Sequence, residues 1–149
     1  MRPLLAERLT TRRRFAQLLA VAALAGPAVA NQEAISRMLL DASRALQARN
    51  AALFLGHFDR KRFEAYSQLE SNIVVLTEQK DIASSIRIVE VTPDGEDFLC
   101  RVDWLIQISP LDRPGLIETR RHMIALRVAA AGKKWRIAGL DPVDFFRPA

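Results

Sequence analysis

Apolar side chains recur at steps of three and four residues along the first part of the domain. This period is typical of an amphipathic helix, and it predicts a helix over residues 34–58 that is interrupted near Asn50. Asn50 can cap a short second helix over residues 51–58, and Asp59 can cap a third over about residues 60–79. The apolar face of the first helix consists of Ile35, Met38, Leu39, Ala42, Ala45 and Leu46.

Farther along the chain, apolar and polar positions alternate, which is the period of a β-strand. The alternation is regular around Cys100, Val102 and Trp104, which fall on one side, and turn sequences with glycine separate the runs. Helices followed by consecutive strands predict an α+β fold with the helices on one face of an antiparallel sheet. The predicted strands cover residues 82–91, 98–109, 116–129 and 135–140, and the tail residues Phe145 and Phe146 are expected to pack onto the domain.

The order of these elements, and a final strand that reads Lys-Trp-Arg-Ile-Ala-Gly-Leu-Asp-Pro over residues 134–142, carry a family resemblance. The chain resembles the nuclear-transport-factor-2-like superfamily, including its SnoaL-like domains, over residues 33–147. The resemblance implies N-terminal helices packed in the concavity of a curved antiparallel β-sheet. It also implies a cone-shaped pocket and, in many members, a homodimer.

The N-terminal segment differs from the rest of the chain. Arg12 and Arg13 precede Phe15, and an apolar stretch follows over residues 15–25. This arrangement resembles a twin-arginine export signal, although the next two residues, alanine and glutamine, depart from the usual leucine and lysine. The resemblance implies recognition by the twin-arginine export machinery, with the general secretory route as an alternative. The apolar stretch is shorter than the roughly 20 residues that span a bilayer, so no stable membrane span is expected in the mature form.

Small residues close this N-terminal segment. Ala28 and Ala30 form the A-x-A pattern of a cleavage site, which predicts a mature protein that begins at Asn31. The predicted organisation is a signal peptide over residues 1–30 and a single domain over residues 31–149. We therefore expect a periplasmic or secreted protein.

Charge and cysteine content narrow the functional classes. The whole chain carries a net charge of +5, but residues 31–149 hold 17 lysines and arginines against 16 aspartates and glutamates. A nearly neutral mature domain argues against a nucleic-acid partner, which would require a clustered basic surface. Cys100 is the only cysteine, so no intramolecular disulfide can form, and its position in the strand pattern predicts a buried, unreactive thiol.

The strand alternation also identifies candidate pocket residues. If the apolar face lines the cone, Trp104 contributes to its wall, and Glu118, Arg120 and His122 add polar groups toward one end. Tyr66 on the third helix can direct its hydroxyl to the same space. Apolar walls with a few polar groups are typical of a ligand pocket. Ordinary structural roles are open for each: core packing for Tyr66, a cross-strand ion pair for Arg120 and an exposed position for His122.

The opposite face of the sheet provides an alternative polar site. It would combine Arg101, Asp103, Gln107 and Arg121, an arrangement reminiscent of epoxide-hydrolysing relatives. Turning this face inward would bury unpaired charges and expose Trp104, so the apolar face is the preferred lining.

No established catalytic pattern is present. His57 and His122 are the only histidines, no group of residues has metal-ligand spacing, and no glycine-rich phosphate loop occurs, so we expect neither a metal nor a cofactor. The leading hypothesis is an exported, non-enzymatic domain that binds a small or lipidic ligand or a partner protein. The alternative is a cofactor-independent isomerase, dehydratase or hydrolase with His122 or Asp103 as the base, and a third possibility is a dimerising module with a filled cone.

Overall fold

The computed structural model describes residues 29–148. Within these residues the chain forms three helices, a four-stranded sheet and a final 3-10 turn, which confirms the α+β fold class. After a first helix over residues 29–47, the elements are α2 (Ala51–Leu55), α3 (Tyr66–Gln79), β1 (Lys80–Asp94), β2 (Asp97–Pro110), β3 (Glu118–Ala131), β4 (Lys134–Asp141) and η1 (Val143–Phe146).

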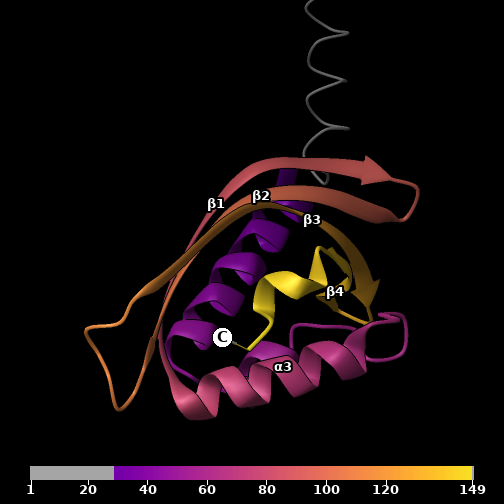
Figure 1. Ribbon diagram of the computed structural model, residues 1–149. Coiled ribbons are helices and arrows are strands. Elements are labelled where there is room, and N and C mark those ends of the chain that lie inside the picture. The colour runs from indigo at the N-terminus through magenta and orange to yellow at the C-terminus, as the bar shows by residue number, and fades with distance from the viewer. Residues whose placement is uncertain (1–28, 149) are drawn as a thin grey trace, which may run out of the picture. The chain divides into compact units, whose positions relative to one another are not determined.

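The sheet is an antiparallel meander in the order β1-β2-β3-β4. The register of the sheet shifts at two β-bulges. One lies between Ile88 and Glu90, and the other lies where Arg127 and Val128 pair with β4. Bulges increase local twist and bend the strands. The sheet accordingly curves around the first helix, and α3 and η1 lie on the same concave side (Figure 1).

The break after the first helix depends on Arg49 and Asn50. Arg49 adopts a positive φ of 57°, and the N–H of Asn50 donates to the carbonyl of Ala45, which closes the helix. The side chain of Asn50 then accepts a hydrogen bond from the N–H of Leu53, so its predicted role as a helix cap is confirmed. Arg49 also donates from Nε to the carbonyl of Thr77, which links this turn to the end of α3.

The predicted start of the third helix at residue 60 is wrong, because α3 begins at Tyr66. Asp59 does accept hydrogen bonds from the N–H groups of Lys61 and Arg62, as a cap would. However, the main chain on either side of Phe58 pairs with Ile137 of β4, since Ile137 donates to the carbonyl of His57 and accepts from the N–H of Asp59. This long-range pairing holds Phe58 beside β4, and turns within residues 60–65 separate it from the start of α3.

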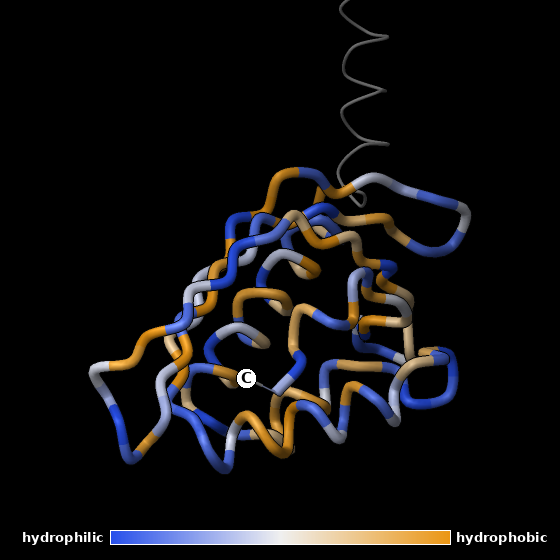
Figure 2. Tube along the Cα trace, viewed as in Figure 1, coloured by the Kyte–Doolittle hydropathy of each residue, from blue (hydrophilic) through white to orange (hydrophobic). Residues whose placement is uncertain are grey.

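Apolar side chains from the helices and from the concave face of the sheet meet between these layers. In Figure 2, hydrophobic positions recur on the helices and strands that border this space. Cys100 belongs to this core and is 1% exposed, and burial raises its thiol pKa to about 11, so the predicted burial is confirmed. Within residues 29–148, no helix combines the length and apolar character needed to cross a membrane.

Candidate functional site

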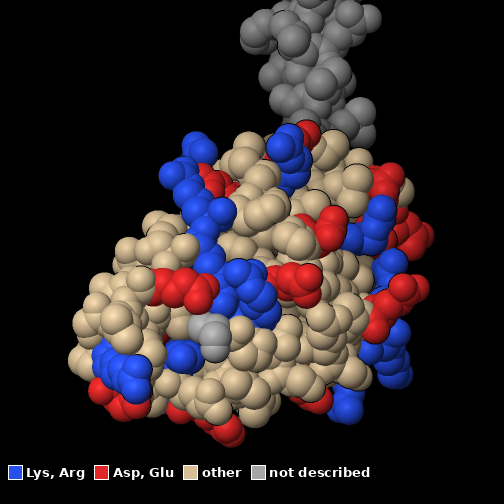
Figure 3. All heavy atoms as spheres, in the orientation of Figure 1, with Lys and Arg blue, Asp and Glu red and all other residues tan. Residues whose placement is uncertain are grey.

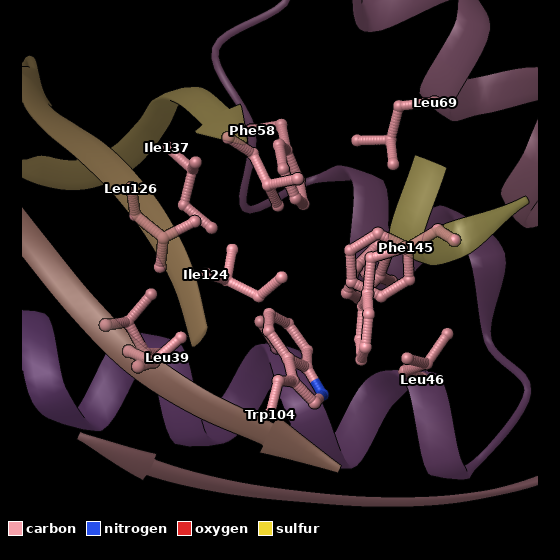
Figure 4. Packing of buried hydrophobic residues seen from close by; sticks show 14 of the residues in the cluster. Leu39, Leu46, Phe58, Leu69, Trp104, Ile124, Leu126, Ile137 and Phe145 are labelled. Atoms are coloured by element: carbon pink, nitrogen blue, oxygen red, sulfur yellow. The ribbon is translucent and has the colours of Figure 1, made fainter. Parts of the chain in front are cut away.

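Aromatic rings fill the interior of the cone. The indole of Trp104 lies 5.1 Å from the ring of Phe146, 6.3 Å from Phe145 and 6.4 Å from Phe54, measured between centroids. Trp104, Phe54 and Phe146 are fully buried. Figure 4 shows Trp104 and Phe145 pointing toward one another, with Ile124 beside the indole. The expectation that Trp104 lines an open cavity is not met, because the C-terminal segment supplies the side chains that occupy the space.

The one polar atom of this indole is satisfied internally. Trp104 Nε1 donates to Ser84 Oγ at 2.9 Å, and Ser84 Oγ lies 2.7 Å from Ser43 Oγ on the first helix. Trp104 therefore needs no ligand to complete its hydrogen bonding.

Arg120 fastens the C-terminal segment over this interior. Its Nη1 donates to the carbonyl of Phe145 at 2.9 Å and to the carbonyl of Arg147 at 2.7 Å. Its Nε donates to the carboxylate of Glu118, two residues earlier on β3. This hydrogen bond and the charge of Arg120 hold the pKa of Glu118 below its usual range. An ion pair was one of the alternatives for Arg120; its partner lies on the same strand rather than on a neighbouring one.

A pocket opens where β3 extends beyond β4. β4 pairs with β3 only from Ala125 onward, so the first part of β3 lies beside the C-terminal segment. The space between them measures about 340 Å³. Its lining residues are Thr119, Arg120, Arg121, His122, Pro142, Asp144, Phe145 and Arg147. We refer to this space as the mouth pocket; it brings together Arg120 and His122, two of the residues predicted from strand alternation.

His122 is exposed at the mouth pocket, and its Nδ1 lies 2.7 Å from the carbonyl of Met123, to which it can donate. Asp144 and Arg147 were missed by sequence analysis. Their contribution depends on how the tail folds back on β3, for which the local pattern carries no signal.

Glu118 and Tyr66 do not join the mouth pocket. Glu118 lines a separate pocket of about 250 Å³ beside the loop between β2 and β3, where Leu116 and Ile117 are exposed. Tyr66 opens α3 and packs against the edge of the core, with the guanidinium of Arg60 located 5.7 Å from its ring centroid. Core packing, the structural alternative for Tyr66, is therefore observed.

The alternative polar site lies on the convex face of the sheet, away from the helices. Asp103 accepts hydrogen bonds from Arg121 at 2.7 Å and from Arg87 at 3.4 Å, and Arg101 lies 3.9 Å from Glu90. The hypothesis that this face lines the cone is wrong, because its residues alternate with the buried side chains that pack against the helices. The Arg121 guanidinium lowers the pKa of the Asp103 carboxyl, which makes it a weaker base.

Charges of both signs lie next to one another in the view of Figure 3, and neither sign covers a large area. His57 follows α2, and its pKa is lowered chiefly by burial, with the charges of Arg136 and Lys134 acting in the same direction and that of Asp41 opposing them. Within residues 29–148, no three histidine, cysteine, aspartate or glutamate side chains converge as a metal site would require.

A groove between α2 and α3 was also missed by sequence analysis. It measures about 650 Å³ and is lined by Ala51, Ala52, Leu55, Glu70, Ser71, Val74 and Val75. In the sequence, the groove could have been recognised from the adjacent apolar residues Val74 and Val75. Val74 is exposed and does not belong to the buried face of α3.

The export-signal residues Arg12, Arg13, Phe15 and Ala28 lie outside the described residues. Ala30 is described; it is exposed and belongs to the first helix.

Comparisons with solved structures support the fold. A protein assigned as a scytalone dehydratase from Novosphingobium aromaticivorans DSM 12444 is similar with a TM-score of 0.63 and 12% identity, over 75% of this chain and 82% of that one. An NTF-2-like protein of unknown function from Shewanella oneidensis MR-1 gives a TM-score of 0.56 and 12% identity, over 74% and 96%. The β subunit of the benzoate 1,2-dioxygenase from Burkholderia mallei ATCC 23344 gives 0.53 and 16%, over 71% and 85%.

No protein-family model matches the chain, and no curated protein is similar to it in sequence. At these identities the structural similarity establishes the fold alone. The chain has the nuclear-transport-factor-2-like fold, in which helices pack inside a curved antiparallel sheet. Proteins with this fold include enzymes as well as subunits that act within larger assemblies.

Proposed function

We propose that the domain acts by binding a small molecule at the mouth pocket, without catalysing a reaction. The observation that carries this proposal is the mouth pocket, which a purely dimerising module would not require; the filled interior, expected for that module too, excludes the interior as the binding site. Trp104 and Phe146 occupy the interior of the cone, and both are 0% exposed, so a substrate could enter this interior only by displacing them. A ligand would then bind at the surface of the cone, and of the three pockets described above the mouth pocket is the one lined by two predicted site residues, Arg120 and His122.

The location of the acid–base groups also supports a binding role. The enzymatic alternative requires His122 or Asp103 as a base. Asp103 lies on the convex face between two arginines, and His122 is exposed at the pocket rim without a carboxylate partner among its hydrogen bonds. A general base is more effective when its environment raises its affinity for a proton, and Arg121 does the reverse at Asp103.

The volume of the mouth pocket favours a small ligand over a lipid chain. About 340 Å³ lies near the lower end of the range of about 300–1,000 Å³ that is usual for small-molecule sites. Pro142 and Phe145 provide apolar wall, while Arg120 and His122 can orient a polar group.

We also propose that the chain is exported by the twin-arginine route and processed before Asn31. This part rests on the sequence around Arg12 and Arg13 and on the pattern that ends at Ala30. The homodimer implied by the family resemblance belongs to the same proposal, and native mass spectrometry of the processed protein measures it directly.

Incubation with a metabolite extract of the producing cells tests the binding role. The protein is mixed with the extract and separated from unbound molecules, and both fractions are compared by mass spectrometry, with heat-denatured protein as the control. We expect one or a few small molecules to be enriched on the folded protein and released unchanged by denaturation. Time-dependent loss of a metabolite with formation of a product would contradict the proposal and favour the isomerase, dehydratase or hydrolase alternative.

A further inference from the structure

One nitrogen of the Arg120 guanidinium, Nη2 with its two N–H groups, has no acceptor. The Arg120 side chain is 6% exposed, its Nε pairs with Glu118, and its Nη1 donates to the carbonyls of Phe145 and Arg147. Its Nη2 is buried and has no hydrogen-bond partner. Buried polar groups are almost always paired, and a charged donor without an acceptor is unfavourable. The site therefore lacks an acceptor beside Nη2.

The surroundings of Arg120 are asymmetric in charge. The mouth pocket is also lined by Arg121, His122 and Arg147, and Asp144 is its one acidic residue. The two carboxylates that pair with its arginines lie elsewhere: Glu118 lines the neighbouring pocket, and Asp103 lies on the convex face with Arg121. An anion in the mouth pocket would thus meet the donors of Arg120, His122 and Arg147, with Asp144 in the lining and the Glu118 carboxylate bonded to Arg120 Nε.

We propose that the mouth pocket binds the carboxylate of a small organic acid. One carboxylate oxygen accepts the hydrogen bond from Arg120 Nη2, which gives the buried guanidinium its missing partner. Arg147 adds positive charge at the rim and His122 can add a hydrogen bond, while the apolar part of the acid lies against Phe145 and Pro142. This inference rests on the proposed binding function and specifies its ligand class.

The local fold explains how Arg120 can serve such a site without becoming mobile. Its Nη1 is fixed by two main-chain carbonyls of the C-terminal segment, at 2.9 Å and 2.7 Å, and its Nε is fixed by Glu118. A guanidinium whose Nε and Nη1 are already bonded holds the two N–H groups of Nη2 in fixed directions, so little conformational entropy is lost when a carboxylate binds.

Isothermal titration calorimetry of the full chain with benzoate and with benzamide tests the ligand class. The two probes have the same ring and nearly the same shape, but only benzoate carries a charge at neutral pH. We expect benzoate to bind about tenfold or more tightly than benzamide, since a charge-assisted hydrogen bond is stronger than a neutral one. Equal binding of the two probes, or no saturable binding of benzoate at millimolar concentration, would overturn the inference. A neutral metabolite found by the extract experiment would leave the binding function standing while this inference fails.

A peptide C-terminus carries the same chemical group, and a third probe separates this source from a free acid. A tetrapeptide that ends in phenylalanine is longer than a pocket of about 340 Å³ accommodates, so we expect it to bind more weakly than benzoate. Tighter binding of the tetrapeptide would assign the site to a peptide carboxylate and overturn the small-acid proposal.

Three variants locate the site. Arg120→Lys keeps the positive charge but loses the planar guanidinium with its fixed N–H donors, and we expect the affinity for benzoate to fall about tenfold. Arg147→Ala removes an exposed cation and leaves its main-chain carbonyl for Arg120, so it preserves folding and is expected to weaken benzoate about threefold. Arg113→Ala is the matched control, since Arg113 is an exposed arginine in the loop between β2 and β3 and does not line the mouth pocket. If Arg147→Ala binds benzoate as the native chain does, or Arg113→Ala weakens it equally, the assignment is wrong.

Discussion

The ring of Phe146 meets the indole of Trp104 edge to face, with their centroids 5.1 Å apart and the planes at 83°. The first of these residues belongs to the C-terminal turn η1, and the second lies at the centre of β2. The contact joins the end of the chain to the middle of the sheet and completes the core. The C-terminal segment is thus part of the folded interior.

Phe146→Ala is expected to lower the free energy of unfolding by about 3–5 kcal/mol, because it removes a fully buried ring and leaves a cavity beside the indole. Urea denaturation monitored by circular dichroism measures the loss. Leu116→Ala is the control, since Leu116 is 57% exposed and its truncation is expected to cost less than about 0.5 kcal/mol. Similar stabilities for the two variants would show that η1 does not contribute to the core.

Ser84→Ala tests the internal hydrogen bond of Trp104. The substitution leaves the buried indole N–H without its acceptor, and the free energy of unfolding is expected to fall by about 1–3 kcal/mol. Ser85→Ala provides a matched control on the next position of β1, where the side chain is exposed. An equal and small effect of both changes would mean that the indole finds water or another acceptor.

The strands were the part of the fold most accessible to sequence analysis. Alternation identified them because one face of the sheet packs on helices and the other meets solvent, and Gly95 and Gly132, both with positive φ, mark two of the turns. The start of α3 was not predictable, because Phe58 is held by Ile137, some eighty positions later, and turns occupy the residues between Phe58 and the helix.

Two features of the site also depended on long-range contacts. The strand pattern placed Arg120 on the inner face, but its acceptors are main-chain carbonyls of the tail, which leave no mark on side-chain periodicity. Packing of the tail aromatics onto the domain was expected from their position after the last strand. Their depth beside Trp104, which fills the cone, follows from the tertiary structure alone.

The pH dependence of stability is expected to reflect His57. Burial lowers the pKa of His57 in the folded protein, so the unfolded chain binds a proton more readily than the folded one as the pH falls. Stability therefore decreases from about pH 7.5 downward through the unfolded pKa of about 6.5, until the folded histidine also becomes protonated. Carboxylates with lowered pKa values, such as Asp103 and Glu118, remain ionised in this window and lose their contribution only at lower pH.

Denaturation of the native chain and of His57→Gln between pH 5.5 and 7.5 measures this slope. We expect the variant to lose less stability over the interval than the native chain. Gln107→Ala serves as the control, because Gln107 is exposed and carries no titratable group, so its replacement is expected to leave the slope unchanged. If the stability of His57→Gln fell more steeply with decreasing pH than that of the native chain, His57 would not be the source of the pH dependence.

Export by the twin-arginine route predicts a strong dependence on both arginines. The double substitution Arg12→Lys with Arg13→Lys keeps the positive charge and removes the guanidinium groups that the receptor reads, so the precursor is expected to remain in the cytoplasm. Cell fractionation and N-terminal sequencing measure the outcome, with a native product that begins at Asn31. Unchanged export of the double variant would assign the chain to the general secretory route.

The central claim is that the ligand binds in the mouth pocket and not inside the filled cone. A benzoate titration followed by ¹H–¹⁵N NMR tests this claim most directly. We expect saturable shifts of the backbone amides of Thr119 and His122 at the mouth pocket, with the indole N–H of Trp104 unmoved and still bonded to Ser84. Saturable shifts of the Trp104 indole and of Ile124, with the amides of the mouth pocket unchanged, would contradict the account. They would mean that the ligand enters the interior and displaces the aromatic side chains of η1.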